Sequence, residues 1–260
     1  MMRYKYVCHQ DIGMRPVNQD SAIALEAETD DGPVMLLSVC DGMGGLSHGE
    51  VASSKMVGRL SEWFGEELPD IIQESRNERD LEKEIFAGMK TASRRADKEI
   101  RAFSNSNGIR CGTTSVALLL FKNKYYVMNI GDSRAYLYRK RLHQLTKDQT
   151  KAQRMIDNNE LSEEEARTHK ASSVLLQCVG TGSLPEPEFC SGTVLADDIF
   201  LLCSDGFRHK VTKEDMENAF SEENPKTTVE LMNTVAYLTE ENKKRGEHDN
   251  ITACVARVFQ

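Results

Sequence analysis

The feature that most constrains this chain is a series of short apolar segments joined by very short connections. The segments are rich in Val, Ile, Leu and Tyr, and Gly, Asp, Asn and Lys bound them, which is typical of strands. Only residues 122–123 separate two of them, and only residues 196–198 separate two more. Connections this short permit hairpins and exclude parallel crossovers, so the sequence predicts mainly antiparallel sheets. The expected strands are 21–26, 34–40, 113–121, 124–130, 135–139, 188–195, 199–203 and 250–259.

Two long segments with helical periodicity lie between the strands expected at 34–40 and 113–121. In residues 49–67 and 79–103, apolar side chains recur at helical spacing, and a third such segment covers 228–242. Each has one apolar and one charged face, which suits packing on the outside of a sheet. The sequence therefore predicts an α+β fold in which stacked antiparallel sheets are flanked by helices.

Two charged stretches interrupt these elements. Residues 66–84 are expected to connect two helices and to lead into the second, and residues 147–170 to form a partly helical surface excursion or lid. Because strand-like segments continue on both sides of each stretch, residues 1–260 are expected to form a single domain.

The composition restricts the kind of molecule that the protein is expected to bind and the cellular compartment in which it is expected to lie. The chain has 33 Lys and Arg against 41 Asp and Glu, a formal charge of −8, which argues against nucleic acid or an anionic membrane as a partner. It has no apolar run near the roughly 20 residues that span a bilayer, and no signal peptide is visible at its start. The seven cysteines form no CxxC pair. Because Cys8, Cys40, Cys203 and Cys254 lie in or beside apolar stretches, we expect buried, reduced thiols and a cytoplasmic location. No large apolar surface stripe remains, so a monomer is expected.

Aspartates stand at the ends of the expected strands. Asp41 and Asp205 follow strands and precede glycines, Asp132 follows the strand at 124–130, and Asp20 and Asp249 precede strands. One such aspartate is usually part of a turn. Several brought together would form an anionic, all-oxygen pocket, which suits Mg²⁺ or Mn²⁺.

Six sequence strings, in this order, resemble the metal-dependent serine/threonine protein phosphatases of type 2C (the PPM family), in its bacterial single-domain branch. The resemblance runs from about residue 11 to the C-terminus. The strings are Asp11-Ile12-Gly13 with Arg15 and Asn18-Gln19-Asp20, Asp41-Gly42-Met43-Gly44-Gly45 with Gly49-Glu50, Cys111-Gly112-Thr113-Thr114, Gly131-Asp132-Ser133-Arg134, Ser204-Asp205-Gly206, and His248-Asp249-Asn250-Ile251-Thr252.

The resemblance implies a central antiparallel β-sandwich with helices on both faces and a metal centre at one end. It implies two Mn²⁺ or Mg²⁺ ions and a third, weaker site. Arg15 would bind the substrate phosphate, and Arg15, Asp20 and Asp41 would take part in catalysis. The segment at about 147–173 would form a flap beside the site. The implied metal-binding residues are Asp41 bridging two ions, the Gly42 carbonyl, Asp205 and Asp249, Asp20 acting mostly through bound water, and Asp132 with Asp205 at the third site.

The implied reaction is hydrolysis of phosphoserine and phosphothreonine in proteins by a metal-bridging water or hydroxide, in opposition to a bacterial serine/threonine kinase. The sequence departs from the family pattern at Met43, where many members have His, so the general acid is unassigned. Gln19 stands where Glu is frequent, and His209 is expected to stay outside the ligand set.

Two other functions compete with this one. A catalytically silent phosphoprotein-binding scaffold on the same fold should have lost metal ligands, yet Asp41, Asp205 and Asp249 are all present. Another two-metal hydrolase, such as a nuclease, is disfavoured by the net negative charge.

Overall fold

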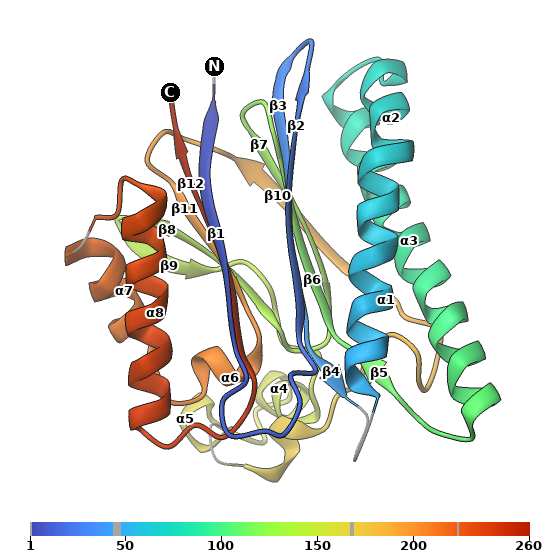
Figure 1. Cartoon of the computed structure of the whole chain (residues 1–260), viewed down its shortest axis with the longest axis vertical. Coiled ribbons are helices and arrows are strands. Elements are labelled where there is room, and N and C mark those ends of the chain that lie inside the picture. The colour runs from blue at the N-terminus through green and yellow to red at the C-terminus, as the bar shows by residue number, and fades with distance from the viewer. Residues whose placement is uncertain (1, 44–47, 167–168, 223) are drawn as a thin grey trace.

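Two five-stranded antiparallel sheets stack face to face in the computed structural model, which describes residues 2–43, 48–166, 169–222 and 224–260 (Figure 1). The first sheet has the order β1 (Arg3–Asp11), β12 (Ile251–Phe259), β11 (Ile199–Cys203), β8 (Arg134–Arg139), β9 (Arg141–Gln144). The second has the order β10 (Glu188–Thr193), β7 (Lys124–Ile130), β6 (Ser115–Phe121), β3 (Gly32–Cys40), β2 (Ser21–Thr29). A short pair, β4 (Gly42–Met43) and β5 (Gly112–Thr113), lies at one end.

Helices cover the outer face of each sheet (Figure 1). Against the second sheet pack α1 (Gly49–Glu62), the π-helical turn η1 (Trp63–Glu67), α2 (Leu68–Glu74) and α3 (Glu78–Asn107). Against the first sheet pack α6 (Asp205–Arg208), α7 (Lys213–Glu222) and α8 (Thr228–Lys244). One apolar layer fills the space between the sheets and one lies under each helical layer. Strands β3, β6 and β11 are buried on both faces, which is why they appear in the sequence as unbroken apolar runs. The predicted α+β sandwich with helices on both faces is confirmed.

Several elements were not predicted or differ from their prediction. The connection expected at 66–84 contains a further helix, since α2 continues from η1. The helix predicted from residue 79 is present as α3, and the side chain of Asn77 caps its start by accepting from the amide of Asp80. Strand β1 and helix α7 have no counterpart in the prediction. In both, charged residues interrupt the apolar pattern on which the prediction depended.

The two short connections behave differently. Residues 122–123 do form a hairpin, between β6 and β7. Residues 196–198 do not, because β10 pairs with β7 in one sheet whereas β11 pairs with β8 and β12 in the other. This connection crosses between the sheets, and the Asp198 carboxylate holds it by accepting from Arg139 and from the amide of Leu195.

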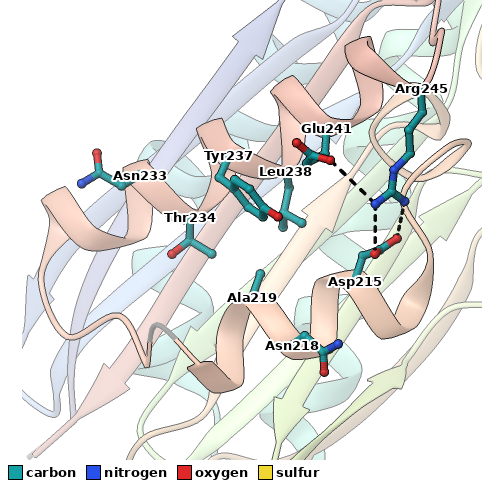
Figure 2. A pocket seen from close by; sticks show the side chains of 9 residues that line it. All are labelled: Asp215, Asn218, Ala219, Asn233, Thr234, Tyr237, Leu238, Glu241 and Arg245. Atoms are coloured by element: carbon teal, nitrogen blue, oxygen red, sulfur yellow. Dashed lines mark hydrogen bonds and ion pairs between the residues drawn. The ribbon is translucent and has the colours of Figure 1, made fainter.

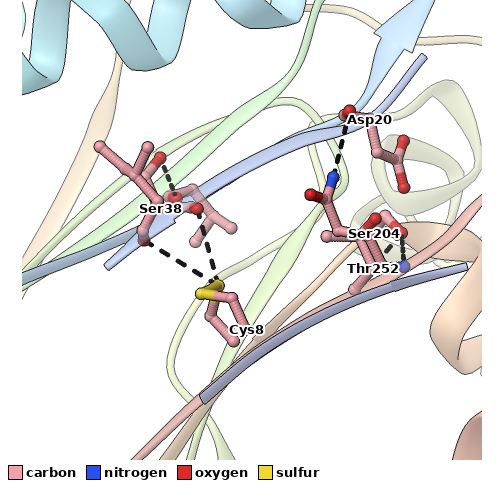
Figure 3. Close-up of a disulfide and its surroundings, with 9 residues drawn as sticks. Cys8, Asp20, Ser38, Ser204 and Thr252 are labelled. Carbon is pink, nitrogen blue, oxygen red and sulfur yellow. Dashed lines mark hydrogen bonds between the residues drawn. A yellow bond between two sulfur atoms is a disulfide. The ribbon is translucent and has the colours of Figure 1, made fainter. Parts of the chain in front are cut away.

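The expectation of reduced thiols at Cys8 and Cys254 is wrong, because a disulfide joins them (Figure 3). The two residues face each other directly in the pairing of β1 with β12, with Cα atoms 4.2 Å apart. Their 246-residue sequence separation gives no local signal of this pairing. Cys40 and Cys203 are free and buried, as expected.

Within the described ranges, no helix is both long and apolar enough to cross a membrane.

Candidate metal centre

The strand order brings the five strand-end aspartates to one end of the sandwich. This is the end at which Figure 1 shows β4, which follows Asp41, and α6, which begins at Asp205. The first residue of β2 pairs with the last of β3, so Asp20 and Asp41 lie at the same edge. The last residue of β11 pairs with the third of β12, which places Asp205 beside Asp249. Asp132 follows β7, whose last residue pairs with the first of β6.

These carboxyl groups are close enough to interact electrostatically. Burial raises the pKa of Asp20 to about 7, with further increases from Asp205 and Asp249, against a partial decrease from the hydroxyls of Thr252 and Ser204 (Figure 3). Burial and then the charge of Asp205 also raise the pKa of Asp132 to about 7, although Arg208 opposes this.

Asp41 lies at the centre of this cluster. Burial, and after it the charges of Asp20, Asp205 and Asp132, raise the pKa of Asp41 well above its usual range. Asp205 is the exception: burial would raise its pKa, but contact with His209 and Asp41 lowers it. Together the five aspartates form one mutually repelling cluster, in which Asp20 and Asp132 are buried and Asp41, Asp205 and Asp249 are partly exposed.

Cations of the protein neutralise part of this charge. Arg15 donates from Nε and Nη2 to the two carboxylate oxygens of Asp249, at 3.0 and 2.8 Å. His209 Nε2 lies 3.3 Å from Asp205 Oδ2, and Arg208 Nη2 lies 3.5 Å from Asp132 Oδ2. With the side chains turned to these partners, no three His, Cys, Asp or Glu residues of the described ranges converge on one ion position.

The chemistry of the cluster nevertheless fits hard divalent cations. Its donors are carboxylate oxygens, and Asp20 Oδ2 is buried with no hydrogen-bond partner. A buried carboxylate oxygen without a partner is costly, so it favours a cation at this place.

Hydrogen bonds fix the backbone around the aspartates. The hydroxyl of Thr114 accepts from the amide of Asp41, and the amide of Gly42 donates to the Gln19 carbonyl at 3.1 Å. The side chain of Asn250 accepts from the amide of Gln19 and donates to two carbonyls of the loop after β1. Asn250 belongs to the last of the six strings, yet its role in holding this loop was not predicted. Gly44 and Gly45 lie outside the described residues.

The predicted flap starts at the site. Gln149 exchanges two hydrogen bonds with Gly131, the neighbour of Asp132: its amide donates to the Gly131 carbonyl and its side chain accepts from the Gly131 amide. The segment is partly helical, as expected, with α4 (Lys151–Asp157), α5 (Glu163–Ala166) and the 3₁₀ turn η2 (Lys170–Ser173).

A surface pocket of about 550 Å³ lies between α7 and α8 (Figure 2). The ion pair of Arg245 with Asp215 borders it, and the exposed ring of Tyr237 projects into it. None of its lining residues is one of the strand-end aspartates.

Gly206 offers a test of how tightly the site is packed. A Cβ at this position would lie 2.1 Å from the carbonyl oxygen of Asn250 and 3.2 Å from Cβ of Asp249. We expect Gly206→Ala to lower the free energy of unfolding by about 1–3 kcal/mol, because the backbone beside Asp249 must shift. Gly58→Ala, in α1 with open space around it, should raise it by about 0.5–1 kcal/mol. Urea unfolding of both variants measures the difference, and equal stabilities would contradict this account.

Comparison with known proteins identifies the family. The family model described as protein phosphatase 2C matches residues 18–161. The serine/threonine phosphatase stp of Listeria monocytogenes serotype 4b is 32% identical over 244 residues, which is 92% of this chain and 89% of the relative. The serine/threonine protein phosphatase PstP of Mycobacterium tuberculosis is 29% identical over 255 residues, 98% of this chain but only 45% of the relative, so this chain spans less than half of that protein.

Solved structures agree over the whole chain. The crystal structure of the Mycobacterium tuberculosis phosphatase PstP/Ppp superposes with a TM-score of 0.82 at 30% identity, covering 99% of each chain. The catalytic domain of PstP in complex with two manganese ions superposes with a TM-score of 0.80 at 28% identity, covering all of both chains. The order of the six strings, the layered sheets and these matches agree, and the chain belongs to the protein phosphatase 2C family.

Proposed function

We propose that this protein is a Mn²⁺- or Mg²⁺-dependent phosphatase that hydrolyses phosphoserine and phosphothreonine in other proteins. The observation that carries the proposal is the cluster of five aspartates at one end of the sandwich, whose mutual repulsion calls for divalent cations. The relatives support it, since those matched are named serine/threonine phosphatases and the PstP catalytic domain was solved with two manganese ions.

The proposed metal-binding groups all belong to this end of the sandwich. When bound, the ions would supply the acidity that turns water into a nucleophile and the charge that offsets the phosphoryl oxygens. The groups are the carboxylates of Asp41, Asp205, Asp249 and Asp20 and the carbonyl of Gly42, with Asp132 and Asp205 for a third ion.

Arg15 is the proposed phosphate-binding residue. Its side chain is about half exposed and rests on Asp249, and it also lies near Asp205 and Asp41. The planar guanidinium can bind two phosphate oxygens at once, so Arg15 can turn from Asp249 to an incoming phosphate without leaving the site. The side chain of Met43 has no proton to donate, so no side chain is assigned to protonate the leaving serine or threonine.

The rest of the proposal concerns the domain organisation, substrates, oligomeric state and location of the protein. Residues 1–260 act as one type 2C-like domain with a flap at about 147–173, and the substrates are phosphoproteins of a serine/threonine kinase. A monomeric state and a cytoplasmic location stay predictions. The Cys8–Cys254 disulfide argues against the location, because reducing compartments rarely retain disulfides.

The test is hydrolysis of p-nitrophenyl phosphate and of a phosphothreonine peptide with Mn²⁺, with Mg²⁺ and with EDTA. We expect turnover of both substrates with metal and none with EDTA. A folded, metal-loaded protein that binds the phosphopeptide without turning it over would instead establish the scaffold function. Cleavage of nucleic acid in place of the phosphopeptide would point to a nuclease.

A further inference from the structure

Glu247 is a buried carboxylate beside the aspartate cluster, and the proposed mechanism gives it no role. It lies in the turn between α8 and β12 and is 5% exposed. Its Oε1 accepts hydrogen bonds from the amides of His248 and Asp249, at 2.8 and 2.9 Å. One oxygen of Glu247 therefore fixes the backbone that carries Asp249.

The other oxygen of Glu247 faces His209. Nδ1 of His209 lies 3.3 Å from Glu247 Oε2, and Nε2 of the same ring lies 3.3 Å from Asp205 Oδ2. A row of carboxylate, imidazole and carboxylate thus connects the turn before β12 to the helix that follows β11. The row reaches both aspartates at these strand ends, Asp205 through the imidazole and Asp249 through its amide.

The hydrogen bonds that Glu247 accepts in the turn do not explain why this residue is a carboxylate rather than an amide. Accepting from two amides requires only a neutral oxygen, whereas a buried carboxylate carries a large desolvation penalty unless it is paired. Oε2 of Glu247 has no hydrogen bond, and its contact with His209 is the interaction that favours a negative charge on Glu247. Side chains that hold metal-binding residues in this way tune affinity for the ion.

Resting on the proposed function, we infer that Glu247 and His209 are positioning residues that together orient the Asp205 carboxylate and the backbone of Asp249 for metal binding.

The experiment measures Mn²⁺ affinity by calorimetry on the EDTA-stripped full chain, alongside its unfolding temperature in EDTA. We expect Glu247→Ala and His209→Ala to weaken Mn²⁺ binding about 10- to 100-fold. Glu247→Gln keeps an oxygen for the two amides but loses the charge toward His209, so its affinity should lie between those of the wild type and Glu247→Ala. It also tests the inference should the alanine variant not fold.

Glu230 provides a matched control. Its carboxylate also accepts from two backbone amides, those of Lys226 and Thr227, but it does so at the start of α8. Glu230→Ala should lower the unfolding temperature and leave Mn²⁺ affinity at the wild-type value.

Three results would overturn the inference. Wild-type affinity in Glu247→Ala and His209→Ala, with only a lower unfolding temperature, would reduce both residues to a structural role. Tighter Mn²⁺ binding in His209→Ala would show that the imidazole competes with the ion. A wild-type protein that binds no Mn²⁺ would remove the proposed function and the inference with it, which distinguishes that failure from the first two.

Discussion

Asp41→Asn is expected to lower kcat/KM for a phosphothreonine peptide with Mn²⁺ by at least about 10³-fold, or about 4 kcal/mol of transition-state stabilisation. Asp41 lies at the centre of the cluster, where burial and then the charges of Asp20, Asp205, Asp132 and Asp249 raise its pKa. Replacing its carboxylate by an amide removes one of the negative charges that would hold the ions. Steady-state kinetics at saturating Mn²⁺ measures the loss.

The same substitution should leave the fold intact. Because Asp41→Asn removes a group whose ionisation the folded protein disfavours, the unfolding temperature in EDTA should stay the same or rise. Asp30→Asn, in the exposed turn between β2 and β3, is the matched control and should retain full activity. Retention of more than a tenth of the wild-type activity by Asp41→Asn would contradict the central place given to this residue.

Without metal, the protein should lose stability as the pH rises from about 5 to about 8. Asp20 and Asp132 have pKa values of about 7 in the folded protein. In the unfolded chain their pKa returns to the ordinary aspartate value of about 3.9. Between these values the folded state binds more protons than the unfolded state, so the free energy of unfolding falls with rising pH, by on the order of a few kcal/mol.

Other groups in the cluster do not reverse this direction. Although burial opposes it, contact with Asp205 and Glu247 raises the pKa of His209 to about 10, so its contribution is also lost as the pH rises, between about 6.5 and about 10. The lowered pKa of Asp205 affects stability only in more acidic solution. Burial lowers the pKa of His9, which acts in the opposite sense.

Thermal unfolding at several pH values, with EDTA and with Mn²⁺, measures this dependence. Since the ions bind the ionised carboxylates, stabilisation by Mn²⁺ should grow with pH over the same window. Asp20→Asn in EDTA should show a shallower dependence, and comparing it with the wild type cancels the contribution of His9. A metal-free unfolding temperature that rises steadily from pH 5 to 8 would refute the assignment of a repelling cluster.

The core strands and the aspartates that end them could be predicted because both signals are local. A strand buried on both faces is an unbroken apolar run, and an aspartate at its end needs only the adjacent sequence to be noticed. Strand β1 escaped prediction because it lies at a sheet edge and mixes charged with apolar residues. Without β1, Cys8 had no visible partner, and the disulfide was missed.

The contacts between distant segments around the site could not be predicted in this way. Glu247 and His209 are 38 residues apart and meet only because β11 pairs with β12. The arginine that rests on Asp249 comes from the loop after β1, at the opposite end of the chain. The assignment of individual metal-binding residues came from the resemblance of the strings, whereas the structure contributed their proximity and their present partners.

The antiparallel pairing of β1 with β12 has a consequence for how this protein can be attached to other molecules. Arg3 lies opposite Phe259, so both ends of the chain emerge side by side, at the upper end of Figure 1. Both strands run from there to the aspartates, and nine residues at about 3.3 Å each give a separation of about 30 Å. A tether or a further domain joined at either end would thus start on the side away from the aspartates. The protein could then be anchored while the proposed metal centre stays open to the phosphoproteins proposed as its substrates.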